Sequence, residues 1–305
     1  LVARHEDRPK SKFFIENLFD EFIPLSGDRH YSEDKSVMTG FAKFNDQSVL
    51  VIGQEKGDDL DSRIERNFGM MRPEGYRKTI RLMKLADKFN IPIIIFVDTP
   101  GAYPGVGAEE RGQAEAIAKS IECSMELKVP TISIIIGEGG SGGAIALASS
   151  NKVIMLENAI YSVISPEGCA TILWRDPKKT LEAAAAMKLS ANDLLDLKII
   201  DEIIPEPLGG AHRDKNLILE NVRNSIERNI NDFNSLTREE IYNNRKEKFL
   251  SIGRTEGFAT SSGKQESLSL QTSLLIDLLN KFKKYKNYVL VGVVLIVVIL
   301  GILII

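Results

Sequence analysis

Apolar and polar positions along the chain follow two periodicities, which predict strands and helices in alternation. Residues 91–98 (IPIIIFVD) and 129–136 (VPTISIII) are short, continuous apolar runs rich in β-branched side chains. Such runs are typical of strands that are covered on both faces of a parallel sheet. Apolar residues at helical spacing predict helices over 73–89 and 108–126, before each of these strands. This order predicts βαβ units and an α/β fold.

Shorter patterns extend this fold on both sides. Residues 37–44 and 48–53 are two β-type runs separated by a polar turn, which predicts a hairpin. Ser190 and Asp193 have the spacing of a helix cap. The remaining expected elements are helices over 142–149, 180–188, 191–197 and, as a pair, 214–250, and strands over 153–156 and within 198–207.

The end of the sequence has a different character. Residues 288–305 are 18 uncharged, mostly aliphatic residues, enough to span ~30 Å of hydrocarbon as a helix. The lysine-rich segment 281–286 precedes them, as expected on the cytoplasmic side of a membrane. A buried core helix is the alternative. We expect a globular domain over 1–255, a polar linker and basic juxtamembrane segment over 256–287 and a transmembrane helix over 288–305, with the folded part cytoplasmic and tethered to the inner membrane.

Composition narrows the class of protein. The 305 residues are 43% hydrophobic and 27% charged with a net charge of −3, which is typical of a globular protein and disfavours nucleic-acid binding. The only cysteines are Cys123 and Cys169, and no CxxC motif occurs. We therefore expect neither a disulfide framework nor a metal site in this chain.

The most unusual segment is GEGGSGG, residues 137–143, between an apolar strand and a helix of small residues. A flexible linker would have polar flanks, and a Walker phosphate loop needs a lysine where Ala144 stands. The segment fits GxGxxG, but no acidic ribose ligand follows in the right context. Backbone amides at a helix start that bind a negatively charged oxygen remain the best interpretation. Because GGSGG also fits the G-x-S-x-G motif, a serine hydrolase with Ser141 as nucleophile stays an alternative, with His212 as the only downstream histidine.

A second loop, residues 98–116, follows the strand 91–98 and is also rich in glycine and proline. A structural turn is one explanation for this composition. Two adjacent parallel strands that both end in glycine-rich loops favour the other, a cleft between the loops with backbone amides on both sides.

Five segments resemble the carboxyltransferase α subunit of bacterial and plastid multisubunit acetyl-CoA carboxylase: RNFGMMRPEGYRK, DTPGAYPGVGAEERGQAEAIA, IGEGGSGGA, YSVISPEGCATILW and IPEPLGGAHRD. The resemblance covers about residues 3–255. It implies a crotonase-like fold of stacked ββα units, followed by C-terminal helices. It also implies the first committed step of fatty acid biosynthesis, in which a carboxyl group passes from carboxybiotin to acetyl-CoA and gives malonyl-CoA.

The partners and cofactors that the resemblance implies follow from that reaction. Biotin is carried on a biotin carboxyl carrier protein and is not attached to this chain. Zinc belongs only to the carboxyltransferase β subunit, which joins the α subunit in an α2β2 heterotetramer, and biotin carboxylase completes the complex. A non-catalytic membrane scaffold that recruits carboxylase subunits is a further alternative.

The resemblance also implies the residues of the site. Gly142 and Gly143 are the expected backbone donors to the ureido oxygen of biotin. The residues expected to shape the loops and bind substrate are Gly139, Gly140, Ser141, Tyr103, Gly105, Val106 and Gly107. The family usually has a helical arm before the segment that starts at Ala3, and the apolar tail is not part of its usual pattern.

Overall fold

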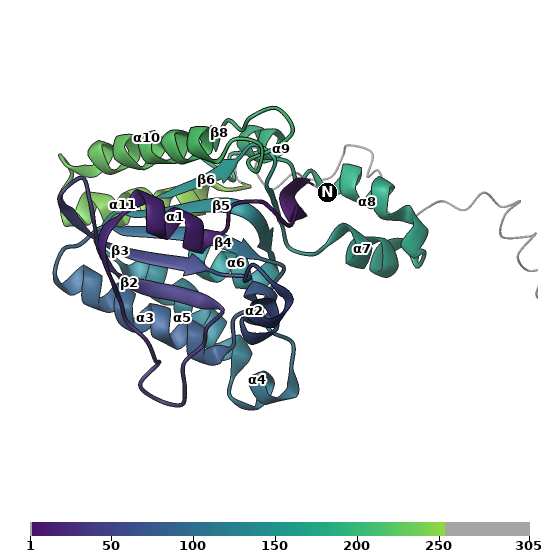
Figure 1. The fold of residues 1–305 in the computed structure, drawn as a ribbon, viewed down its shortest axis with the longest axis horizontal. Coiled ribbons are helices and arrows are strands. Elements are labelled where there is room, and N and C mark those ends of the chain that lie inside the picture. The colour runs from purple at the N-terminus through teal and green to yellow at the C-terminus, as the bar shows by residue number, and fades with distance from the viewer. Residues whose placement is uncertain (1, 254–305) are drawn as a thin grey trace, which may run out of the picture.

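The computed structural model describes residues 2–253, which form one mixed sheet of eight strands (Figure 1). Seven strands lie in the order β1-β2-β3-β4-β5-β6-β8, and β7 pairs with the end of β5. Strands β1 to β3 are antiparallel, and β3, β4, β5, β6 and β8 are parallel. The bounds are β1 Asp20–Pro24, β2 Val37–Phe44, β3 Gln47–Gln54, β4 Ile93–Thr99, β5 Thr131–Gly140, β6 Lys152–Leu156, β7 Ile160–Ser162 and β8 Glu202–Ile204. The predicted hairpin and the predicted α/β class are confirmed.

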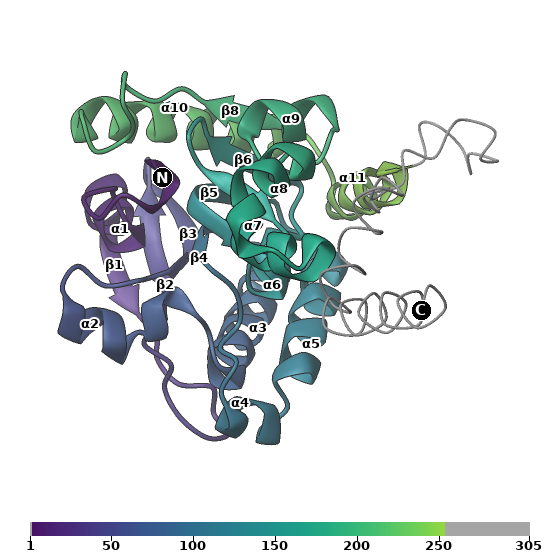
Figure 2. The same cartoon turned by 90° about the vertical axis from the view of Figure 1, so that its right-hand side faces the viewer.

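Helices cover both faces of the sheet (Figure 1). Helices α1 (Ser11–Leu18) and α10 (Lys215–Phe233) lie on one face, and α3 (Pro73–Lys88), α5 (Gln113–Glu126) and α6 (Ser141–Ala148) on the other. Helix α11 (Arg238–Ser251) packs beside α5 (Figure 2). The shorter helices are η1 Val2–Arg4, α2 Leu60–Glu65, η2 Asn67–Gly69, α4 Val106–Glu110, α7 Pro166–Cys169, η3 Ala170–Trp174, η4 Pro177–Lys179, α8 Thr180–Met187 and α9 Ala191–Asp196.

The two central strands form where the apolar runs predict them. All seven residues of β4 are buried, and it pairs with β5 in register from Ile93 opposite Thr131 to Val97 opposite Ile135. The sequence predicted a loop from Gly137 onward, and this was wrong, because β5 continues through Gly140. Strand β7 pairs with Glu138–Gly140 on one side, and Thr99 lies opposite Gly139 on the other, so neighbours on both edges keep these glycines extended.

Residues 163–187 form a small lobe that extends away from the sheet (Figure 1). We call this segment, which contains α7 and α8, the lobe. Its own core consists of Cys169, Ala170 and Ala183. Its surface nevertheless exposes large apolar side chains: Val163, Ile172, Leu173 and Leu181. Exposed apolar side chains that gather in one segment are typical of an interaction surface.

The predicted linker (256–287) and the predicted transmembrane helix (288–305) lie outside the described residues, so both stay predictions. Over residues 2–253, no helix has both the length and the apolar character needed to span a bilayer.

Candidate active site

The chain passes from β5 to α6 in a tight turn, in which Gly142 is half-buried and Gly143 is buried. Gly140 is extended, Ser141 takes a left-handed conformation with φ of 51°, and the helix begins there. The first amides of a helix have no acceptor one turn earlier within it. Over residues 2–253, the N–H groups of Gly142 and Gly143 make no hydrogen bond outside the helix either. Both can therefore donate to an oxygen placed at the helix start, where the helix dipole favours negative charge.

Close packing around the turn explains its glycines, with one exception. A Cβ atom on Gly140 would lie 2.2 Å from the carbonyl oxygen of Pro100, and one on Gly143 would lie 2.6 Å from the carbonyl carbon of Gly101. On Gly142 the nearest atom would be a methyl carbon of Ile117 at 3.6 Å, which is ordinary contact. A side chain at Gly143 would thus disrupt the fold, whereas Gly142 can be changed without a clash.

The second glycine-rich loop meets this turn at one end only. The Thr99 hydroxyl donates to the Gly101 carbonyl (2.7 Å) and accepts from the Gly101 amide (3.1 Å), and this holds the loop start against Gly143. The rest of the loop turns toward other partners. The Tyr103 amide donates to the Met71 carbonyl (3.0 Å), and the Tyr103 ring lies 4.7 Å from the Arg72 guanidinium carbon.

The structure therefore divides the predicted residues into two groups. Gly139, Gly140 and Ser141 form one continuous turn with the two amide donors. Gly105 packs on the Tyr103 ring, and Val106 and Gly107 begin α4, where Val106 is 75% exposed. The structure therefore brings the first group together with the amide donors and leaves the second group apart from the turn.

An apolar hollow of about 500 Å³ opens beside the turn. Ile145 of α6 and Tyr161 of β7 line it, and the Tyr161 ring packs against Gly139. Ser162 of β7 adds to this side, and the other walls come from the lobe, from α9 and from the residue Ile199 after it: Val163, Ile164, Cys169, Ile172, Leu173, Met187, Leu194 and Ile199. Burial raises the pKa of Tyr161 to about 12, so its phenol stays neutral. Because the hollow is lined by apolar side chains and a neutral phenol, it suits the binding of an uncharged ring system.

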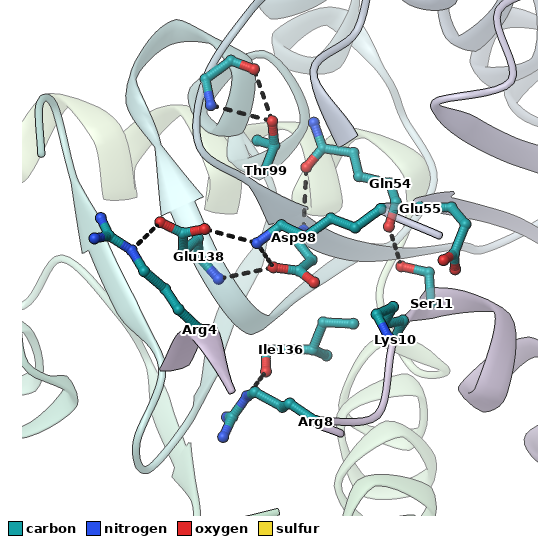
Figure 3. Close-up of polar contacts among 12 residues, drawn as sticks. Arg4, Arg8, Lys10, Ser11, Gln54, Glu55, Asp98, Thr99, Ile136 and Glu138 are labelled. Atoms are coloured by element: carbon teal, nitrogen blue, oxygen red, sulfur yellow. Dashed lines mark hydrogen bonds and ion pairs between the residues drawn. The ribbon is translucent and has the colours of Figure 1, made fainter. Parts of the chain in front are cut away.

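An ionic cluster joins the ends of β4 and β5 to the N-terminal segment (Figure 3). Lys56 forms ion pairs with Asp98 (2.8 Å) and Glu138 (2.7 Å), and Arg4 pairs with Glu138 from the other side. The Asp98 carboxylate also accepts from the amide of Glu138 (2.9 Å). Burial opposes ionisation of Glu138, but Lys56 and Arg4 hold the pKa of its carboxyl below the ordinary value. Burial likewise opposes the Lys56 charge, yet Asp98 and Glu138 raise the pKa of the ammonium.

Sequence reasoning missed this cluster. Asp98 and Glu138 are the acidic residues near the ends of two otherwise apolar strands, and that position was the only available signal. Their partners Lys56 and Arg4 come from segments that no motif connects to either strand.

Neither a serine–histidine pair at Ser141 nor a metal site is formed in the described part of the chain. The Ser141 hydroxyl makes no hydrogen bond to a histidine over residues 2–253, and His5 and His212 stack on each other at 3.8 Å between ring centroids. No group of three or more His, Cys, Asp or Glu side chains that could hold a metal occurs in the same range.

The chain has a mixed α/β fold of the kind found in solved carboxyltransferases. Solved structures share the fold. The transcarboxylase 12S hexamer core matches with a TM-score of 0.60 at 20% identity, covering 73% of this chain and 41% of that chain. A Pseudomonas malonate decarboxylase heterotetramer in complex with coenzyme A matches with a TM-score of 0.57 at 17% identity, covering 69% and 84%.

Within that class, the chain belongs to the acetyl co-enzyme A carboxylase carboxyltransferase-like family, whose model matches residues 1–253. The acetyl-coenzyme A carboxylase carboxyl transferase subunit alpha of Pelagibacter ubique is 75% identical over 296 residues, which cover 96% of this chain and 80% of that protein. The subunit of the same name from Sphingopyxis alaskensis is 56% identical over 253 residues, covering 83% and 80%. The family resemblance is confirmed, and membership implies a β subunit as partner in a multisubunit complex.

Proposed function

We propose that the chain binds carboxybiotin at the turn between β5 and α6, for transfer of the carboxyl group to acetyl-CoA and formation of malonyl-CoA. The observation that carries this proposal is the pair of free amides at Gly142 and Gly143 beside an apolar hollow, in a chain of this family. When bound, carboxybiotin supplies the carboxyl group and then a nitrogen base for the acetyl methyl proton. It remains attached to its carrier protein, and biotin carboxylase acts on that carrier.

The chain's own contribution is electrostatic. The amides of Gly142 and Gly143 donate to the ureido oxygen, where negative charge accumulates during transfer. Each such donor contributes about 3 kcal/mol of transition-state stabilisation. The apolar walls at Ile145 and Tyr161 bind the uncharged part of the cofactor and exclude water, which strengthens the amide contacts. Binding through backbone amides and apolar walls requires no titratable side chain in the turn.

We further propose that the β subunit, in an α2β2 assembly, covers the lobe and closes the hollow. The lobe extends from the sheet, exposes Leu181 at 85% and Leu173 at 51%, and forms one wall of the hollow (Figure 1). A partner seated there would bury this apolar surface. It would also bring its acetyl-CoA site toward the amides.

Leu181→Asp should weaken binding of the β subunit about tenfold, because it places a charge in a desolvated interface. Leu208→Asp is the matched control, since Leu208 is a fully exposed leucine outside the lobe. Both variants should fold, because each side chain is at the surface. Titration of each variant with the β subunit in an analytical ultracentrifuge measures the effect, and equal affinities for the two variants would reject the lobe as the docking surface.

Ser141→Ala separates this function from the serine hydrolase alternative, which family membership does not support. The Ser141 hydroxyl has no partner over residues 2–253, so the variant complex should form malonyl-CoA within about twofold of the wild-type rate. A fluorophosphonate probe should label neither protein. Covalent labelling of Ser141, together with loss of all activity in the variant, would instead establish a nucleophile.

A further inference from the structure

Gln54, the last residue of β3, connects the two glycine-rich loops from inside the protein. Its side chain is fully buried. The side-chain nitrogen donates to the carbonyl oxygen of Gly143 at 2.9 Å, and the side-chain oxygen accepts from the amide of Asp98 at 3.2 Å. Figure 3 shows the second of these contacts, with Gln54 beside the ionic cluster of Asp98 and Glu138.

The first turn of α6 packs closely against the backbone of Gly101, and Gln54 adds a hydrogen bond from β3 that holds it there. No side chain caps this helix, and Ser141 just ahead of the free amides is held in the uncommon left-handed conformation. The Gly143 carbonyl belongs to the same residue as one of the two amide donors. A hydrogen bond to that carbonyl fixes the peptide group between Gly143 and Ala144, which directly follows the two peptide groups that carry the donor amides in the same helical turn.

Gln54 is itself held in place. Its backbone carbonyl accepts from the Ser11 hydroxyl, and its side-chain nitrogen also lies 3.4 Å from the sulfur of Met71. A buried amide with both ends satisfied is rigid, and a partly satisfied one costs free energy. The Gln54 side chain thus couples the position of the first turn of α6 to the positions of β3 and β4.

We propose that Gln54 is a positioning residue for carboxyl transfer, which holds the Gly142 and Gly143 amides in the orientation that binds the developing negative charge. This inference rests on the proposed function. It predicts that loss of the hydrogen bond to Gly143 lowers kcat about tenfold and leaves the KM for acetyl-CoA unchanged.

Gln54→Glu tests the hydrogen bond without a change of shape. A protonated glutamic acid can donate to the Gly143 carbonyl and accept from the Asp98 amide, as glutamine does, whereas a carboxylate cannot donate. The charged groups around it are Glu55, Asp98 and Glu138, which favour protonation, and Lys56, which opposes it. Burial also favours the protonated form.

The experiment measures kcat and KM of the full-length chain with its β subunit for wild type, Gln54→Glu and Gln54→Met across the pH range in which the wild type is active. The ratio of wild-type to Gln54→Glu kcat should rise about tenfold as pH increases, and Gln54→Met should stay about tenfold low throughout. Asn229→Leu in α10 is the control, because Asn229 is a buried amide bonded to Glu202 (2.8 Å) that lies on the other face of the sheet. It should lower the melting temperature without changing kcat.

Two outcomes would overturn the role of Gln54: a wild-type kcat in Gln54→Met, or a pH-independent ratio for Gln54→Glu. If either occurs while Gly142→Pro is inactive in the same assay, the proposed amide site stands without Gln54. If Gly142→Pro and both Gln54 variants are fully active, the proposed site itself falls.

Discussion

Gly142→Pro should lower the kcat for malonyl-CoA formation about 10²- to 10³-fold, because proline removes one of the two proposed amide donors. Gly142 is the second residue of α6. Proline is tolerated in the first turn of a helix, since the lost N–H has no acceptor within the helix. The change therefore removes a donor to the substrate and no hydrogen bond of the fold. The assay is malonyl-CoA formation by the variant in complex with the β subunit.

Gly142→Ala is the matched control for this variant. It keeps the amide, and its Cβ would come no closer than 3.6 Å to Ile117, so it should fold and keep most of the activity. Circular dichroism and thermal melting of both variants separate a lost donor from a lost fold. Normal turnover by a folded Gly142→Pro variant would exclude the Gly142 amide from the reaction.

Hydrophobic patterning predicted most of the sheet and helices, because local spacing determines them. The apolar runs that became β4 and β5, the hairpin of β2 and β3 and the helix over Pro73–Lys88 all lie where the pattern placed them. The Ser190 cap also forms, with its hydroxyl oxygen accepting from the Asp193 amide. Each of these depends on neighbours a few residues apart in the sequence.

Features made by distant segments were not predictable in the same way. Gly139 and Gly140 look like part of a loop, and they are extended because β7 and Thr99 pair with this end of β5 from other parts of the chain. Likewise, Gln54 gives no sign in the sequence that it reaches Gly143, 89 positions away. The family resemblance predicted the turn, whereas the residues that hold the turn in place come from distant segments that carry no sequence signal.

Lys56→Met should lower the free energy of unfolding by about 3 kcal/mol at neutral pH, because it leaves two neighbouring carboxylates in the interior without their shared ammonium. The Lys56 side chain is only 18% exposed, and those of Asp98 and Glu138 are 7% and 11% exposed. Urea denaturation measures the loss. Lys119→Met is the control, since both side chains of the ion pair of Lys119 with Glu122 (2.7 Å) are more than half exposed, and its loss should change the stability little.

The loss of stability in Lys56→Met should also depend on pH. The direction of this dependence distinguishes an effect of charge from an effect of packing. In the wild type, the pKa of Glu138 lies below 4.5, so the stability that Glu138 contributes is present above about pH 4.5 and is lost as pH falls through its folded-state pKa. Without Lys56, burial favours protonation of the Glu138 carboxyl more strongly, and its folded-state pKa rises. The stability difference between wild type and Lys56→Met should therefore be larger at about pH 8 than at about pH 5.

Adding Asp98→Asn to Lys56→Met should restore part of the stability. Glu138 keeps its ion pair with Arg4, so Asp98→Asn removes the carboxylate that Lys56→Met leaves without a cation. A difference that is the same at both pH values and is unaffected by Asp98→Asn would mean that Lys56 stabilises the fold through packing of its aliphatic chain and not through charge.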